Sequence, residues 1–145
     1  RDVFRSAKTM WHWYALTAMG CFATMQLIFT YLNRKGVAPA ATLLWVFAFG
    51  ALFYVGHMRV TRTPMPVAPS SIALMVVAAA LAYVGNLSSV RSLTLAPNPG
   101  YAVALVSMQA AVVTLVATAI FGLTVTWMKA RGVLLCCLGI ALLVV

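Results

Sequence analysis

The chain carries one long stretch without charge, between Arg91 and Lys129. Its opening has the residues that favour the first turn of a helix. Asn98 can accept hydrogen bonds from free backbone N–H groups, and Pro99 has no N–H to leave unpaired. Residues 101–121 then run apolar with a few polar interruptions. These features predict a membrane-spanning helix that begins at Pro99.

The composition excludes an ordinary soluble domain. Hydrophobic residues make up 64% of the 145 residues and charged residues 8%. A soluble fold could not hide this much apolar surface, whereas a lipid bilayer solvates it. The net charge is +9, because ten Lys and Arg accompany one acidic residue, Asp2. The basic residues are scattered between apolar runs, which indicates loops facing an anionic leaflet and no nucleic-acid partner.

Charged and proline-rich segments divide the chain into five apolar runs. Residues 1–10 form a basic juxtamembrane lead-in. Residues 58–70 contain three prolines, so we predict a loop there, with Ser70 or Ser71 capping the next helix. The predicted fold is all-α, a polytopic membrane protein with a single transmembrane domain over residues 1–145. The five predicted spans are residues 11–32, 40–57, 71–94, 99–121 and 127–145.

The basic residues also predict an orientation. Five spans place the two termini on opposite sides, with seven basic residues on the side of the N-terminus and three on the other. The positive-inside rule then predicts a cytoplasmic N-terminus and an outside C-terminus. The expected location is a plasma or inner membrane, with an organelle membrane as the alternative. The seven are Arg1, Arg5, Lys8, Arg59, Arg62, Lys129 and Arg131, and the three are Arg34, Lys35 and Arg91.

Small residues at helical spacing predict how the spans pack. Apolar helices gain nothing from packing Leu against Leu in lipid, so close contact requires small side chains. Gly20 with Thr24 and Gly132 with Cys136 have this spacing. We therefore predict a tightly packed helical bundle in which small residues form the contacts.

Groups for catalysis or metal binding are scarce. With Asp2 as the one acidic residue, no acidic dyad, carboxylate-oriented histidine or acidic metal site can form. His12 and His57 are isolated in the sequence. The cysteines (Cys21, Cys136 and Cys137) lie in apolar stretches without metal or redox spacing, so we expect them to pack as small hydrophobes. The sequence predicts no enzyme, no catalytic residue, no metal and no cofactor.

Residues 71–145 contain glycine and proline residues at positions that are typical of a known family of membrane proteins. Gly85-Asn86 stands near the end of the third span, and Ala96-Pro97-Asn98-Pro99 forms the turn into the fourth. Further positions follow at the end of the fourth span and in the fifth: Gly122, Thr126, Trp127, Gly132 and Gly139. In these features the chain resembles the drug/metabolite transporter superfamily, in particular a single EamA-type repeat of five helices.

The resemblance implies a transporter fold with two departures. The family's Glu after the glycine that ends the fourth helix is Leu123 here, and the usual proline of that helix is replaced around Ala110-Ala111. Single repeats of five helices form half of a ten-helix transporter. The resemblance therefore implies a homodimer or a pairing with another membrane protein, in addition to the contact with the lipid bilayer.

Polar residues near the third and fourth spans form a candidate substrate cavity. Tyr83 and Asn86 are one turn apart, and Asn98 and Gln109 are eleven residues apart, so each pair shares a helix face. Arg91 either snorkels to the outer headgroups or contributes its charge to an anion site beside the dipole of the fourth helix. Asn86 and Gln109 could equally bond each other across helices, for about 0.6 kcal/mol. The candidate residues are Tyr83, Asn86, Arg91, Asn98, Tyr101 and Gln109.

Two functions are consistent with these features. The first is transport of small polar or anionic metabolites by an EamA-like dimer or pair. The second is a non-transporting membrane scaffold or accessory subunit, whose polar residues only hold helices together. Because no membrane-embedded carboxylate is available, proton-coupled antiport of the small multidrug type is nearly excluded, and a facilitator or an accessory role is favoured over an active pump.

Overall fold

The described part of the chain is all-helical. The computed structural model describes the backbone of residues 2–64, 67–122, 124 and 126–144, and the side chains of these residues except 2–11, 129 and 144. No strand occurs among these residues. The six helices are α1 (Asp2–Arg34), α2 (Pro39–Thr61), α3 (Pro69–Leu95), α4 (Pro99–Ser107), α5 (Gln109–Phe121) and α6 (Trp127–Val144).

Four segments have the length and composition of membrane spans. These segments have 23 to 27 residues and at most two charged residues in their most apolar window. A helix of 20 residues already covers the roughly 30 Å of a hydrocarbon core. The protein therefore has the features of an integral, multi-pass membrane protein. The segments are His12–Arg34, Pro39–Thr61, Pro69–Leu95 and Pro99–Phe121.

The predicted fifth span is a helix, but a shorter one. α6 has 18 residues, or about 27 Å at 1.5 Å per residue, just under the thickness of a hydrocarbon core. Its apolar part runs over Ala130–Leu143. The fifth crossing, and with it the predicted placement of the termini on opposite sides, stays a prediction.

Two predicted boundaries are wrong. α2 continues to Thr61, four residues past the predicted end, with Arg59 in its last turn, where a basic side chain interacts favourably with the helix dipole. α3 begins at Pro69, and the amides of Ser71 and Ile72 both donate to the carbonyl of Ala68, at 2.9 and 3.2 Å. The cap position is thus Ala68, and the two serines lie inside the first turn. Proline at the first helical position explains the earlier start.

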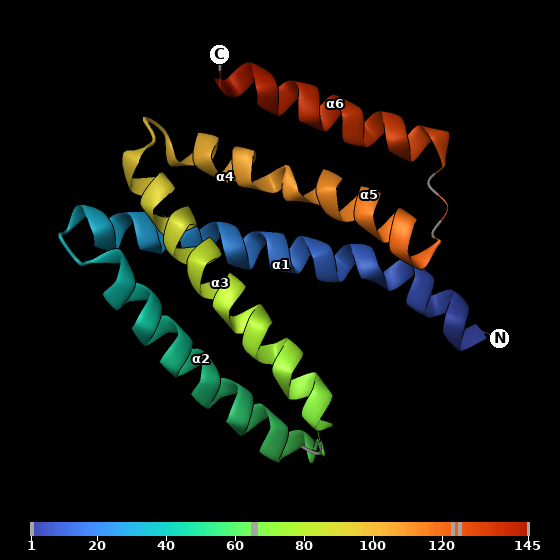
Figure 1. Ribbon diagram of the computed structural model, residues 1–145, viewed down its shortest axis with the longest axis horizontal. Coiled ribbons are helices and arrows are strands. Elements are labelled where there is room, and N and C mark those ends of the chain that lie inside the picture. Colours follow the sequence, from blue (N-terminus) through green and yellow to red (C-terminus); the bar gives the residue numbers. More distant parts are fainter. Residues whose placement is uncertain (1, 65–66, 123, 125, 145) are drawn as a thin grey trace. The chain divides into compact units, whose positions relative to one another are not determined.

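The chain divides into two compact units, Arg1–Val90 and Arg91–Val145, with the boundary inside α3. In the first unit α1 contacts α2, and Figure 1 shows α2 and α3 running in opposite directions. In the second unit α6 contacts both α4 and α5. Figure 1 shows α6 lying along the α4–α5 segment and running in the opposite direction.

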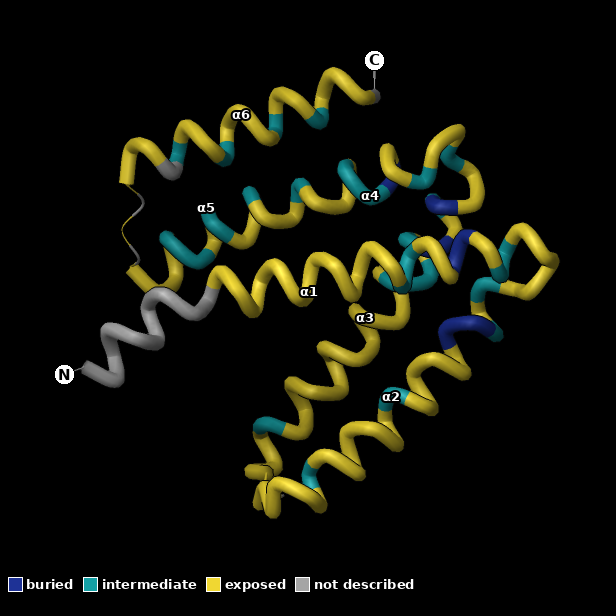
Figure 2. The backbone as a smooth tube through the Cα atoms, turned by 180° about the vertical axis from the view of Figure 1, so that it is seen from behind, coloured by how far each residue is buried: buried dark blue, intermediate teal, exposed yellow. Residues whose placement is uncertain are grey.

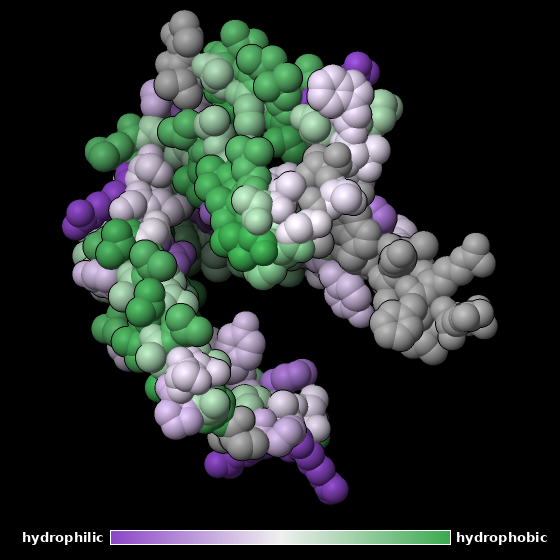
Figure 3. Space-filling model, turned by 45° about the vertical axis from the view of Figure 1, so that its right-hand side comes forward, coloured by the Kyte–Doolittle hydropathy of each residue, from purple (hydrophilic) through white to green (hydrophobic). Residues whose placement is uncertain are grey.

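Burial in the first unit is confined to one end. The buried side chains come from the last turns of α1, the first turns of α2 and the last part of α3, and most others are exposed (Figure 2). Apolar side chains form much of the visible surface in Figure 3. This distribution fits helices whose apolar sides face lipid. The buried residues of this unit are Phe29, Thr30, Thr42, Leu43 and Val90.

The predicted tight packing at glycines is not observed within either unit. A Cβ added at Gly20 or Gly85 in the first unit, or at Gly132 in the second, would meet no heavy atom within 4 Å. The helix contacts inside each unit therefore form elsewhere, and the glycine faces remain open. For these three glycines the expectation of close helix contact is wrong inside each unit.

Aromatic and basic side chains pair at two helix ends. The Lys35 ammonium lies 4.9 Å from the ring centre of Tyr31 at the end of α1. The Arg131 guanidinium lies 5.2 Å from the ring centre of Trp127 at the start of α6. Such cation–π pairs suit the headgroup level of a bilayer, where aromatic and basic side chains are both enriched.

Candidate functional site

The start of α4 is capped as predicted. Asn98 is in an extended conformation, and its Oδ1 accepts a hydrogen bond from the amide of Gly100 at 2.9 Å. Pro99 occupies the first helical position and has no N–H. The amide of Tyr101 donates to the carbonyl of Asn98 at 3.0 Å. The first-turn amides are therefore already bonded within the chain, so an anion near this helix would depend on charge and dipole instead of free N–H groups.

Arg91 is the one charged residue among the six candidate residues. It lies on α3, four residues before the helix ends at Leu95, and its side chain is exposed. In the second unit it precedes Asn98 by seven residues, and Tyr101 is 46% exposed in the first turn of α4. The described side chains include no Asp or Glu. Arg91 therefore has no carboxylate counterion in that part of the chain, and its charge is available to a ligand or to lipid.

Tyr83 and Asn86 belong to the first unit. Both lie on α3, about 60° apart around the helix, as the predicted spacing requires. The Nδ2 of Asn86 donates to the carbonyl of Ala82 on the same helix, at 2.7 Å, and Tyr83 is 64% exposed. Arg91 lies about 140° around α3 from Asn86. The helix itself therefore does not bring Arg91 onto the face shared by Tyr83 and Asn86.

The predicted continuous helix over residues 99–121 is interrupted at Met108. The amide of Met108 donates to the carbonyl of Leu105 at 3.1 Å, and the amide of Ala111 donates to the carbonyl of Met108 at 3.0 Å. Both bonds reach back three residues instead of four, as in a 3₁₀ turn. Gln109, which is exposed, begins α5 directly after the break. The predicted common face of Asn98 and Gln109 assumed a regular helix, and the break changes that geometry.

An apolar groove lies among the described residues of each unit. In the second unit the groove has a volume of about 320 Å³ and lies between the α4–α5 break and α6, where Ser107, Met108 and Cys137 are among its lining residues. In the first unit the groove has a volume of about 490 Å³ and is lined by α1 and α2, including Gly20 and Cys21. None of the six candidate residues lines either groove. That these six residues form a substrate site therefore stays a prediction.

Two polar groups that sequence reasoning missed are buried in the first unit. Thr30 and Thr42 are 7% and 4% exposed, and their hydroxyls donate to the carbonyls of Gln26 and Ala38 on their own helices. The amide atoms of Asn33, in the last turn of α1, are also shielded from solvent, with no hydrogen-bond partner among the described residues. The signal for this cluster in the sequence is the presence of these three polar side chains on both sides of the turn between α1 and α2.

Comparison of the chain with models of protein families, with curated proteins and with solved structures gives no match. The resemblance to the EamA-type repeat therefore stays a prediction from the motifs. The described residues contain no group of three or more His, Cys, Asp or Glu side chains that could hold a metal ion.

Proposed function

We propose that the chain is a transporter subunit that moves small polar or anionic metabolites across a plasma or inner membrane. It works as a homodimer or together with a second membrane protein. The predicted orientation, with the N-terminus cytoplasmic, is part of this proposal, as is the resemblance to a single EamA-type repeat. Enzymatic activity is not part of it.

The observation that carries the proposal is Arg91. An ionisable residue inside an apolar helix is costly in a bilayer and by default marks a path for a ligand. Arg91 lies in Pro69–Leu95, one of the four segments that are long and apolar enough to cross a membrane, and the described side chains offer it no carboxylate. Its charge, together with the positive end of the α4 dipole, favours a ligand with a negative or strongly polar group.

The interrupted fourth span supports the same proposal. Met108 keeps helical dihedrals, with φ −59° and ψ −18°, so the span tightens to a 3₁₀ turn there, and such turns within a helix often mark a functional hinge. The break at Met108 faces a groove shared with α6. With the predicted fifth span the subunit is half of a ten-helix transporter, so a second copy or a partner completes the pathway.

Uptake into proteoliposomes tests the proposal. The purified chain is reconstituted and assayed with a panel of radiolabelled carboxylates, phosphate esters and neutral polar metabolites. We expect uptake of at least one anionic or polar compound. Arg91→Gln should reduce that uptake about tenfold, because a hydrogen bond to a charged group contributes about 1.5–3 kcal/mol. Arg91→Lys, which keeps the charge, should retain part of the activity.

Arg34→Gln is the matched control, because Arg34 is also an exposed arginine near a helix end. Equal uptake by wild type and Arg91→Gln would remove Arg91 from the pathway and favour the snorkelling alternative. A complete lack of uptake over the panel, by a folded chain of any oligomeric state, would favour the second function. That function is a scaffold or accessory subunit, and the apolar lining of both grooves is the observation in its favour.

A further inference from the structure

The C-terminal end of α2 has an arginine in an unusual backbone conformation. Arg62 follows the last helical residue with φ 51° and ψ 35°, in the left-handed region. Among the described residues it is the one non-glycine residue with a positive φ. Helices commonly end with glycine at this place, because a side chain is strained there. The backbone alone therefore does not explain why an arginine occupies this position.

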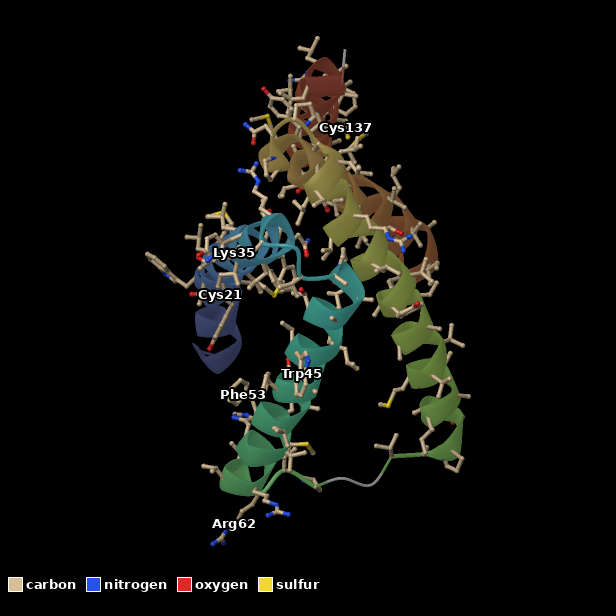
Figure 4. All side chains as sticks on the ribbon, turned by 90° about the vertical axis from the view of Figure 1, so that its left-hand side faces the viewer. Cys21, Lys35, Trp45, Phe53, Arg62 and Cys137 are labelled. Carbon is tan, nitrogen blue, oxygen red and sulfur yellow. The ribbon has the colours of Figure 1, made fainter. Side chains whose placement is uncertain are left out.

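The turn that holds Arg62 is well defined. Its amide donates to the carbonyl of Met58, and the amide of Thr63 donates to the same carbonyl at 3.1 Å. The hydroxyls of Thr61 and Thr63 are hydrogen-bonded to each other at 2.7 Å. Figure 4 shows Arg62 at the end of α2 with its guanidinium pointing away from the helix. Hydrogen bonds thus fix the backbone of the turn, and the guanidinium is exposed.

A second arginine lies at the same helix end. Arg59 is in the last turn of α2, three residues before Arg62, and both side chains are exposed. The single acidic residue of the sequence is Asp2, so the described side chains supply no carboxylate to either guanidinium. The negative end of the α2 dipole offsets part of this charge. The rest of the charge is available to an anion outside the chain.

The position of the two arginines identifies the anion. α2 is an apolar helix of 23 residues that can cross a membrane, so its end lies at the level of the lipid headgroups. Guanidinium groups bind phosphate oxygens through paired N–H donors. We propose that Arg59 and Arg62 form a binding site for the phosphate of an anionic phospholipid headgroup. This site is independent of transport and goes beyond the proposed function.

The opposite end of α2 provides the comparison. There Lys35 lies over the ring of Tyr31 at 4.9 Å, so its ammonium already has a partner within the chain. Arg34 and Lys35 also supply two basic residues, the same number as Arg59 and Arg62. Neutralising either pair changes the net charge equally. A difference between the two pairs therefore reports a specific site instead of general electrostatic attraction.

The experiment measures the lipid retained by the purified full-length chain. The chain is extracted from vesicles of phosphatidylcholine with a minor fraction of phosphatidylglycerol, and bound lipids are quantified by mass spectrometry. We expect phosphatidylglycerol to be enriched over its fraction in the vesicles. Arg59→Gln/Arg62→Gln should lower the enrichment more than about tenfold, because it removes charge-assisted hydrogen bonds to the phosphate. Arg34→Gln/Lys35→Gln should leave most of it.

Two further arms separate binding from folding and from the source of phosphate. Arg62→Gly relieves the positive φ, so it should keep or raise thermal stability while it lowers the enrichment. Inorganic phosphate at the same concentration should fail to displace the lipid. The proposal is overturned if the enrichment is absent, if the Arg34/Lys35 pair loses as much, if Arg62→Gly retains full enrichment, or if inorganic phosphate displaces the lipid.

Discussion

Two spans of this chain have the same length and the same kind of start, but they differ in how they end and in whether they are continuous. α2 and the α4–α5 segment each cover 23 residues and begin with proline at the first helical position. α2 is continuous and ends on Arg62, whereas α4–α5 is broken at Met108 and ends on Gly122. Apolar length thus determines that a segment can span. The ends and the continuity depend on a few individual residues.

The caps differ as well. Asn98 caps α4 through its side chain, whereas Ala38 precedes α2 without a side-chain hydrogen bond. Both residues have extended backbone conformations, with ψ of 123° and 135°. The proline is therefore sufficient to begin a helix after a residue without a capping side chain. The asparagine adds a bond to one of the backbone donors that helix starts leave free.

The largest effect is expected at the end of the second of these spans. Gly122→Val places a β-branched side chain at φ 62°, and a left-handed conformation costs an L-residue about 1–2 kcal/mol. A Cβ at Gly122 would meet no heavy atom within 4 Å, so the cost is conformational and not steric. We expect a lower midpoint of denaturation in detergent, followed by circular dichroism.

Gly139→Ala is the matched control for this change. Gly139 lies inside α6, and an added Cβ would also meet no heavy atom within 4 Å. Alanine in a helix interior is favoured over glycine by about 0.5–1 kcal/mol, so this variant should raise the midpoint. Equal destabilisation by both variants would mean that the open glycine faces are covered by a partner, and it would contradict the conformational explanation.

A smaller effect is expected at the two caps. Asn98→Ala removes the 2.9 Å bond to the amide of Gly100 and should cost about 1 kcal/mol, the usual contribution of an N-cap side chain. Ala38→Asn makes the reverse change at the start of α2 and should gain a similar amount. Chemical denaturation in detergent measures both. Asn98→Asp keeps the acceptor and serves as the control; if it were as destabilising as alanine, the cap would not be the cause.

The start of α4 and the apolar spans could be predicted, because they depend on local chemistry. Pro99 and Asn98 act within a single turn. The four spans, with 23 to 27 residues each, are long enough to cross the hydrocarbon core of a bilayer. The end of α2 was predicted too early, at residue 57, because the two arginines and three prolines of residues 58–70 predict a loop over the whole segment. Residues 58–61 continue the helix since Arg59 in the last turn is favourable for the dipole.

The grooves and the buried polar groups could not be predicted, because they depend on contacts between helices. Thr30 and Thr42 are twelve residues apart and become buried together with the α1–α2 contact. The sequence candidates were chosen along α3 and α4, where polar residues are dense. The described residues instead bury polar side chains near the turn between α1 and α2, and Asn33 carries the unpaired amide.

The smallest effect is expected at the break itself. The hydroxyl of Ser107 donates to the carbonyl of Val103 at 2.9 Å, and such bonds can bend a helix. The hydroxyls of Thr114 and Thr118 make the same kind of bond within α5, at 2.7 Å, and α5 is continuous around both residues. The bond of Ser107 is therefore not sufficient to interrupt the helix.

We expect Ser107→Ala to change the free energy of unfolding by less than about 0.5 kcal/mol, as for substitutions away from a core or a network, and to leave the break in place. Amide hydrogen exchange at Met108 and Ala111 measures the break, with Thr114→Ala as the matched control. Slower exchange of both amides in Ser107→Ala alone would show that the hydroxyl causes the break. Unchanged exchange would instead favour the contacts of α6 with α4 and α5 as the cause of the break.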